Sequence, residues 1–97
     1  MSLADICSTL FPRLNDHDDF LGLVDGHGSS FQIRIYGGYL LDVPLPDRNG
    51  SLELTVDKDE ALQRLAAIPR LFTADAFEDY EFHPWPQHVE TPWWRFW

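Results

Sequence analysis

The pattern of hydrophobic residues changes its period along the chain, and each period predicts a different kind of element. Near the N-terminus the apolar positions have the spacing that is typical of one face of a helix. Ser2 is a suitable N-cap for this helix, Asp5 adds a negative charge to its first turn, and Pro12 is expected to end or kink it near Phe11. The buried face is predicted to consist of Leu3, Ile6, Cys7 and Leu10.

From residue 20 the apolar residues alternate with polar ones, which is typical of strands. Strands are predicted over residues 20–24, 31–36, 39–45 and 51–56. Gly37 and Gly38 form a hairpin turn that requires positive φ angles. Pro44 and Pro46 cannot donate hydrogen bonds to a ladder, so the third strand is expected to end at a sheet edge or to leave the sheet.

A second helix is predicted to follow residue 57. Asp57 caps it, Glu60 completes an acidic variant of the capping box, and Pro69 ends it. Residues 73–77 are expected to add one helical turn. The buried stripe of this second helix is predicted to be Ala61, Leu62, Leu65, Ala66 and Ile68.

Residues 78–84 alternate once more and predict a fifth strand, with Tyr80 and Phe82 on one side and Asp79, Glu81 and His83 on the other. Short loops make consecutive strands antiparallel neighbours, and two amphipathic helices can cover the same sheet face. We therefore expect an α+β fold with an antiparallel sheet of four to five strands and two helices packed on one face, in the order α-β-β-β-β-α-β. Residues 1–97 are predicted to form a single domain, of which 83–97 are an extended C-terminal tail rich in Pro and Trp.

The composition is strongly acidic, and this narrows the classes of partner. Sixteen acidic residues against seven basic ones give a formal net charge of -9. Such a surface repels phosphate backbones and anionic lipids, so direct binding to nucleic acid or to a membrane is not expected. It attracts a basic protein, although solubility alone explains acidity equally well. The single cysteine and the absence of a signal-peptide or membrane-span pattern predict a cytoplasmic protein.

No catalytic or metal-binding motif emerges from the remaining polar residues. The adjacent His17, Asp18 and Asp19 lie in a solvated loop, and His83 and His88 lack the spacing of a metal motif. Cys7 lies on an apolar helix face, and Ser29 and Ser30 have no strand-turn-helix context. His27 beside Asp25 resembles half of a catalytic triad, and loop polarity explains it equally well. We therefore predict no enzyme activity, no metal and no cofactor.

Two features suggest a surface for binding another protein. Asp79 and Glu81 are expected to project to the same side of an extended segment, where like charges are unfavourable unless a partner relieves them. The tail carries large aromatic side chains that either fold back on the sheet, as expected for Trp85, or dock on another chain, for example in a homodimer. The predicted partner-binding residues are Asp75, Glu78, Asp79, Glu81, Trp93, Trp94 and Trp97.

These features favour a small acidic cytoplasmic protein that inhibits a basic protein partner by occluding its active site. In size, acidity and absence of motifs the chain is similar to bacterial immunity proteins, which neutralise a cognate toxin, often a nuclease. The resemblance is one of type and identifies no particular family. Three other hypotheses stay open: a phage nucleic-acid mimic of the anti-CRISPR kind, a small acid-base enzyme that uses His27, His83 or an aspartate, and a homo-oligomeric subunit sealed by its tail.

Overall fold

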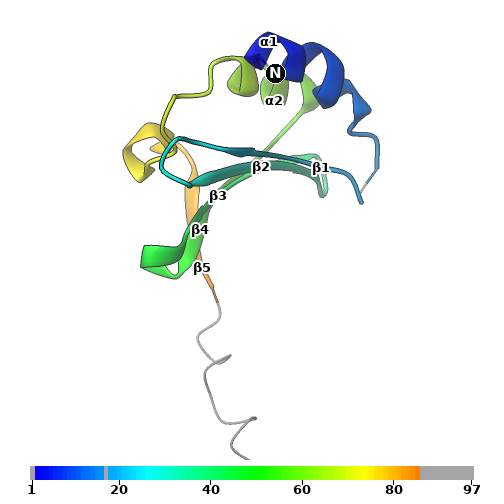
Figure 1. Ribbon diagram of the computed structural model, residues 1–97. Coiled ribbons are helices and arrows are strands. Elements are labelled where there is room, and N and C mark those ends of the chain that lie inside the picture. The colour runs from blue at the N-terminus through cyan, green and yellow to red at the C-terminus, as the bar shows by residue number, and fades with distance from the viewer. Residues whose placement is uncertain (1, 17, 86–97) are drawn as a thin grey trace, which may run out of the picture.

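The computed structural model describes residues 2–16 and 18–85, and within these residues the strands form one antiparallel sheet in the order β1-β2-β3-β4-β5 (Figure 1). Helices cover one side of this sheet, as the alternating sequence pattern predicted. The fold is therefore α+β, with a second helix between β4 and β5. The strand bounds are β1 Phe20–Val24, β2 Ser30–Ile35, β3 Tyr39–Leu45, β4 Gly50–Val56 and β5 Glu81–Pro84.

The N-terminal helical segment continues further than expected. A capping box between Ser2 and Asp5 starts α1 (Leu3–Asp5), which runs into a π-helical turn, η1 (Ile6–Leu10), and a 3-10 turn, η2 (Phe11–Arg13). The π-helical turn ends at Leu10, so the helix changes type at the predicted position of the end or kink that was assigned to Pro12. Pro12 stands in the first turn of η2, where a missing N–H costs no hydrogen bond.

The hairpins set the register of the sheet. Gly37 and Gly38 have φ angles of 65° and 132°, which confirms the predicted turn between β2 and β3. β3 and β4 are joined by the 3-10 turn η3 (Pro46–Arg48) and pair along their whole length. The pairing of β3 with β2 reaches only to Asp42, so Pro44 lies where β3 has left β2, as its missing N–H predicts.

The second helix, α2 (Lys58–Ala66), begins at the predicted cap. The Asp57 carboxylate accepts the backbone N–H of Glu60 at 2.8 Å. The Glu60 side chain does not complete a capping box, because its carboxylate accepts the Nε–H of Arg64 at 2.8 Å instead. The predicted buried stripe is also too wide. Ala61 and Leu65 are buried, whereas Leu62 and Ala66 are exposed, since only a narrow side of α2 contacts the sheet.

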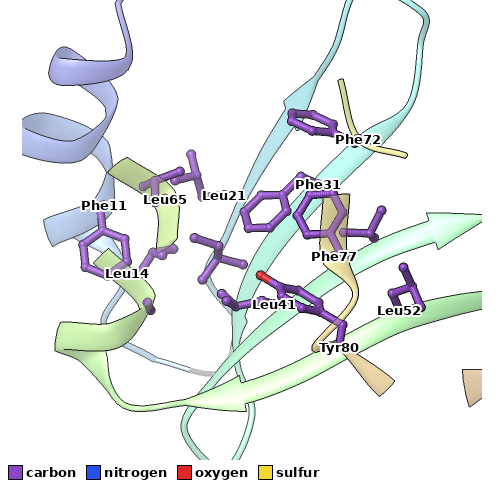
Figure 2. Packing of buried hydrophobic residues seen from close by; sticks show 13 residues of the cluster. Phe11, Leu14, Leu21, Phe31, Leu41, Leu52, Leu65, Phe72, Phe77 and Tyr80 are labelled. Carbon is purple, nitrogen blue, oxygen red and sulfur yellow. The ribbon is translucent and has the colours of Figure 1, made fainter. Parts of the chain in front are cut away.

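The hydrophobic core lies between the helices and the sheet. Helical residues such as Phe11 and Leu65 meet strand residues such as Leu21 and Leu41, all of them buried (Figure 2). Next to them Phe31, Phe72, Phe77 and Tyr80 form an aromatic cluster, with neighbouring ring centroids 5.1–6.3 Å apart. Phe77 comes from the 3-10 turn η4 (Ala74–Phe77), which follows α2 and leads into β5.

The fifth strand is shorter than the alternation of residues 78–84 predicted. It begins at Glu81, because the backbone N–H of Tyr80 bonds to the carbonyl of Phe77 and closes a turn before the strand. Tyr80 is buried against Phe77, whereas Phe82 is partly exposed. In the described part of the chain no helix is long and apolar enough to cross a membrane.

Candidate functional site: the helix-free face of the sheet

The two faces of the sheet differ in chemistry. Side chains alternate between the faces along each strand, and the strand register shows which residues share a face. One face packs on the helices and is apolar. We call the other the helix-free face (Figure 1). Its residues on the strands and at the β2–β3 turn are Phe20, Gly22, Val24, Ser30, Gln32, Arg34, Tyr36, Leu40, Asp42, Pro44, Ser51, Glu53, Thr55, Glu81 and His83.

A row of three carboxylates crosses this face. Asp42 on β3 pairs with Glu53 on β4, and Glu53 pairs with Glu81 on β5. We call these three residues the acidic row. Directly opposed residues have Cβ atoms only about 5 Å apart, and like charges in such positions destabilise the sheet. The row is therefore an unfavourable arrangement that the fold nevertheless maintains.

Asp42 is the most unusual member of the acidic row because it is buried, with 7% of its surface exposed. Burial and the neighbouring charge of Glu53 raise its pKa above the ordinary value, while Arg34 and the Ser51 hydroxyl act in the opposite direction. The guanidinium of Arg34 is 3.7 Å from Oδ2, a loose ion pair. Neither group satisfies Oδ1, which is buried and has no hydrogen-bond donor among the described residues.

A hollow lies beside the acidic row. One part of it, about 250 Å³ in volume, is lined by residues that include Arg34, Tyr36 and Leu40 together with Glu53. A second part of about 440 Å³ shares Tyr36, Leu40 and Glu53 and extends to Glu81 on β5. The two parts of the hollow share these three residues as walls. We call this hollow the acidic hollow.

Exposed apolar side chains lie on the same face. Phe20 is 64% exposed and Tyr36 77%, and Val24 is also largely exposed. Trp85 directly follows β5, and its indole N–H donates to the Ser51 hydroxyl oxygen at 2.8 Å, which confirms that this residue folds back onto the sheet. Exposed aromatic residues are enriched in protein-binding surfaces.

Only two of the predicted acidic contact residues meet at the acidic hollow. Asp79 and Glu81 both line it, whereas Asp75 and Glu78 are exposed on or just after η4 and are not among its lining residues. Asp79 lies in the turn before β5 and not in an extended strand as expected. Its carboxylate is 2.7 Å from Nη2 of Arg64, and this contact lowers its pKa. A partner within the chain therefore relieves the charge of Asp79, which sequence reasoning had left unexplained.

The remaining predicted residues divide into those with a structural role and those outside the described part. Asp25 holds the β1–β2 loop and the segment after α2 together, since its carboxylate accepts the backbone N–H groups of His27, Ser29 and Phe72 at 2.8–2.9 Å. It is thus engaged with the backbone and not with the His27 ring as a triad would require. Within residues 2–16 and 18–85 no group of three or more His, Cys, Asp or Glu side chains is arranged to hold a metal ion. The structure does not describe His17, His88, Trp93, Trp94 and Trp97.

Asp42 and Glu53 were not among the predicted site residues. The available signal was a carboxylate inside "YLLDVPL", where both neighbours on the same strand face, Leu40 and Pro44, are apolar. Comparison with protein-family models, curated proteins and solved structures finds no match to this chain. Its function must therefore be inferred from its own geometry.

Proposed function

We propose that the chain is a small acidic binding protein that inhibits a basic protein partner by covering the partner's active site with the helix-free face. The observation that carries this proposal is the acidic row beside the acidic hollow, flanked by exposed aromatic residues. Carboxylates that repel one another in the free protein gain a counter-charge in the complex, so part of the cost of holding them together is recovered on binding.

The partner in this proposal is a bacterial toxin, possibly a nuclease, and the chain is its cytoplasmic immunity protein. A net charge of -9 steers a basic partner toward the chain and accelerates the encounter. A nuclease active site is basic because it binds phosphates. An acidic surface with aromatic residues at its margin therefore complements such a site in both charge and contact area.

The predicted tail residues are proposed as contacts separate from those of the helix-free face. Trp93, Trp94 and Trp97 stay predicted contacts with the partner or with a second copy of the chain. Truncation after Pro92, followed by light scattering on a sizing column, separates these cases. Loss of a dimer on truncation assigns the tail to self-association, and an unchanged monomer leaves it available to the partner.

A growth-rescue assay tests the proposed function. A basic toxin that is a candidate partner is expressed in a bacterial host with and without the chain, and survival is scored. We expect the wild-type chain and Asp47→Lys to protect the host, and Glu53→Lys to fail. Asp47 is exposed on η3 and outside the acidic row, so it controls for the change of charge. Protection by Glu53→Lys equal to that of wild type would refute a role for the acidic row.

Acid-base catalysis at the same place is the second candidate function. The observation that favours it is Asp42, a buried carboxylate with a raised pKa, which is typical of a general acid. Against it, Asp42 is not among the residues that line the acidic hollow, so a substrate has no evident access to it. Turnover of simple ester or phosphate substrates that disappears in Asp42→Asn would support catalysis, and no turnover above the buffer rate would count against it.

A further inference from the structure

In the described part of the chain, β1 and β5 are the outer strands of the sheet, and their free edges differ in sequence. β5 carries Glu81, His83 and Pro84, and charged residues and proline are the usual protection of an edge against pairing with another chain. β1 has the sequence FLGLV, with no charged residue and no proline. Phe20 and Val24 are 64% and 70% exposed, although both side chains are apolar. β1 is therefore an edge strand that is open to pairing.

The backbone of β1 presents hydrogen-bonding groups to this open edge. The N–H of Asp25 donates to the carbonyl of Ser29 at 2.9 Å, so the peptide groups of Asp25 face the neighbouring strand β2. In an antiparallel pair the direction of these groups alternates from one residue to the next. The N–H and C=O groups of Phe20, Gly22 and Val24 therefore point away from β2, and no other segment in the described part of the chain bonds to them.

We propose that β1 pairs with β1 of a second copy of this chain, antiparallel and centred on Gly22, so that the two sheets become one. The outward-facing residues are evenly spaced about Gly22, so a two-fold axis at Gly22 places each of them opposite another outward-facing residue. Gly22 meets Gly22 of the second copy, and Phe20 of each copy meets Val24 of the other. Residues opposed in this way exchange both backbone hydrogen bonds, and an aromatic ring opposite a β-branched side chain stabilises the pairing. The edge is thus complementary to itself, which identifies a second copy as its occupant.

The charges at the two ends of β1 are complementary in this arrangement. Because the paired strands are antiparallel, the start of β1 in one copy lies beside the end of β1 in the other. Residues 13–19, before β1, carry three carboxylates and one arginine. After β1, the exposed Arg70 and His27 line a hollow of about 490 Å³, and the Asp25 carboxylate is held by backbone N–H groups. An acidic segment of each copy therefore meets a basic one of the other, and symmetry repeats this contact twice.

This inference does not depend on the proposed function. No residue of β1 lines the acidic hollow, so each copy in the dimer keeps the acidic row, Tyr36 and Trp85 available to a partner protein. The growth-rescue assay with Glu53→Lys and the measurements below can therefore fail separately.

Light scattering on a sizing column, over a wide range of protein concentration, tests the pairing. We expect the wild type to be a dimer that dissociates on dilution. Val24→Lys places a charge on the edge and should be a folded monomer, whereas Leu62→Lys makes the same change of charge on the exposed side of α2 and should stay a dimer. Gly22→Pro should also be monomeric, because it removes an N–H that faces the second copy and none that β2 uses. A Cβ at Gly22 meets only the Phe20 ring, at an ordinary 3.8 Å, so this substitution is compatible with the fold.

A second pair of variants tests the charged ends of β1. Arg70→Gln should weaken the dimer several-fold, because it removes the cation that faces the acidic segment of the second copy. Arg48→Gln is the matched control, since Arg48 is exposed on η3 and distant in sequence from both ends of β1, and it should leave the dissociation constant unchanged. Equal weakening by both variants would contradict the proposed orientation of the two copies.

Amide exchange of the wild type, followed by NMR, locates the interface without any substitution. The amide protons of Gly22 and Val24 should exchange slowly where the chain is dimeric and rapidly on dilution. A wild type that is monomeric at every concentration, or a dimer that Val24→Lys leaves intact, would overturn the inference. A dimer that is lost on truncation after Pro92 while the Gly22 amide exchanges rapidly in the intact chain would also overturn it, and would assign self-association to the tail.

Discussion

Asp42→Asn is expected to stabilise the protein at neutral pH, although it removes the charge of a residue in an ion pair. The wild-type carboxylate is buried, faces Glu53, and leaves Oδ1 without a donor. The amide keeps a polar atom at the Oδ1 position but removes the buried negative charge, and each unit by which burial and Glu53 raise the pKa of Asp42 corresponds to about 1.4 kcal/mol. The Arg34 contact that the substitution removes is long and half exposed, so it contributes less than about 1 kcal/mol.

The net effect is a gain on the order of 1 kcal/mol in the free energy of unfolding. An asparagine amide at this position also donates toward Glu53 on the neighbouring strand, so that repulsion is replaced by a hydrogen bond. For a chain of this size, such a gain raises the melting temperature by roughly 4–8 °C.

The pH dependence of this gain identifies its cause. The pKa of Asp42 is raised in the native state, so the native protein retains this proton to a higher pH than the unfolded chain does. Below the ordinary carboxyl pKa of 3.8, Asp42 is neutral in both states, and the wild type and the variant should differ little. As the pH rises through the native pKa of Asp42, the wild type loses the stability that came from holding this proton more tightly than the unfolded chain does. The difference in the free energy of unfolding between Asp42→Asn and the wild type therefore grows to a plateau.

Urea unfolding of both proteins from acidic to neutral pH measures this difference. Asp47→Asn serves as the control and should change stability by less than about 0.5 kcal/mol, since Asp47 is an exposed surface residue. If Asp42→Asn destabilises the protein at neutral pH, or if its gain is the same at every pH, the reasoning about a strained, buried carboxylate is refuted.

Three further substitutions test the fold. Phe77→Ala removes a buried ring from the aromatic cluster and should cost about 3–5 kcal/mol in urea unfolding, and a loss below about 1 kcal/mol would contradict the packing. Gly50→Ala places a Cβ 2.8 Å from the carbonyl oxygen of His83 and against the Phe82 ring, so we expect a loss of about 1–3 kcal/mol and faster amide exchange in β5. Unchanged exchange there would show that Gly50 is not needed for this pairing. Asp25→Asn should lower the melting temperature at neutral pH, because hydrogen bonds from the backbone of Phe72, Ser29 and His27 depress the pKa of Asp25 in the native state. The stability that the ionised Asp25 carboxylate contributes is present above its ordinary pKa and is lost as the pH falls through its lowered native pKa. The difference in stability between the wild type and Asp25→Asn should therefore vanish in strong acid.

Local sequence signals predicted most of the elements. The bounds of β1 and β3, the Gly37–Gly38 turn and the Asp57 cap are confirmed, because alternation, glycine conformation and capping act within a few residues. The helix changes near Phe11 as predicted, and a further 3-10 turn follows, because a proline that ends one helical turn can begin the next.

The candidate site could not be predicted in the same way. The acidic row exists only because the register of β3, β4 and β5 places Asp42, Glu53 and Glu81 opposite one another. This register depends on two connections, one of which, between β4 and β5, passes through α2 and η4. The pairing of Arg64 with Asp79 depends on the same long connection, so sequence reasoning treated Asp79 as an unrelieved charge.

The affinity of the proposed basic partner for Glu53→Lys, compared with its affinity for Asp47→Lys and the wild type, tests the central claim most directly. Both substitutions change the net charge equally, and only Glu53 belongs to the acidic row. We predict that Glu53→Lys weakens the complex about a hundredfold, mainly through faster dissociation, while Asp47→Lys changes the dissociation constant by no more than about threefold. Equal dissociation constants for the two variants would contradict a role for the helix-free face in binding.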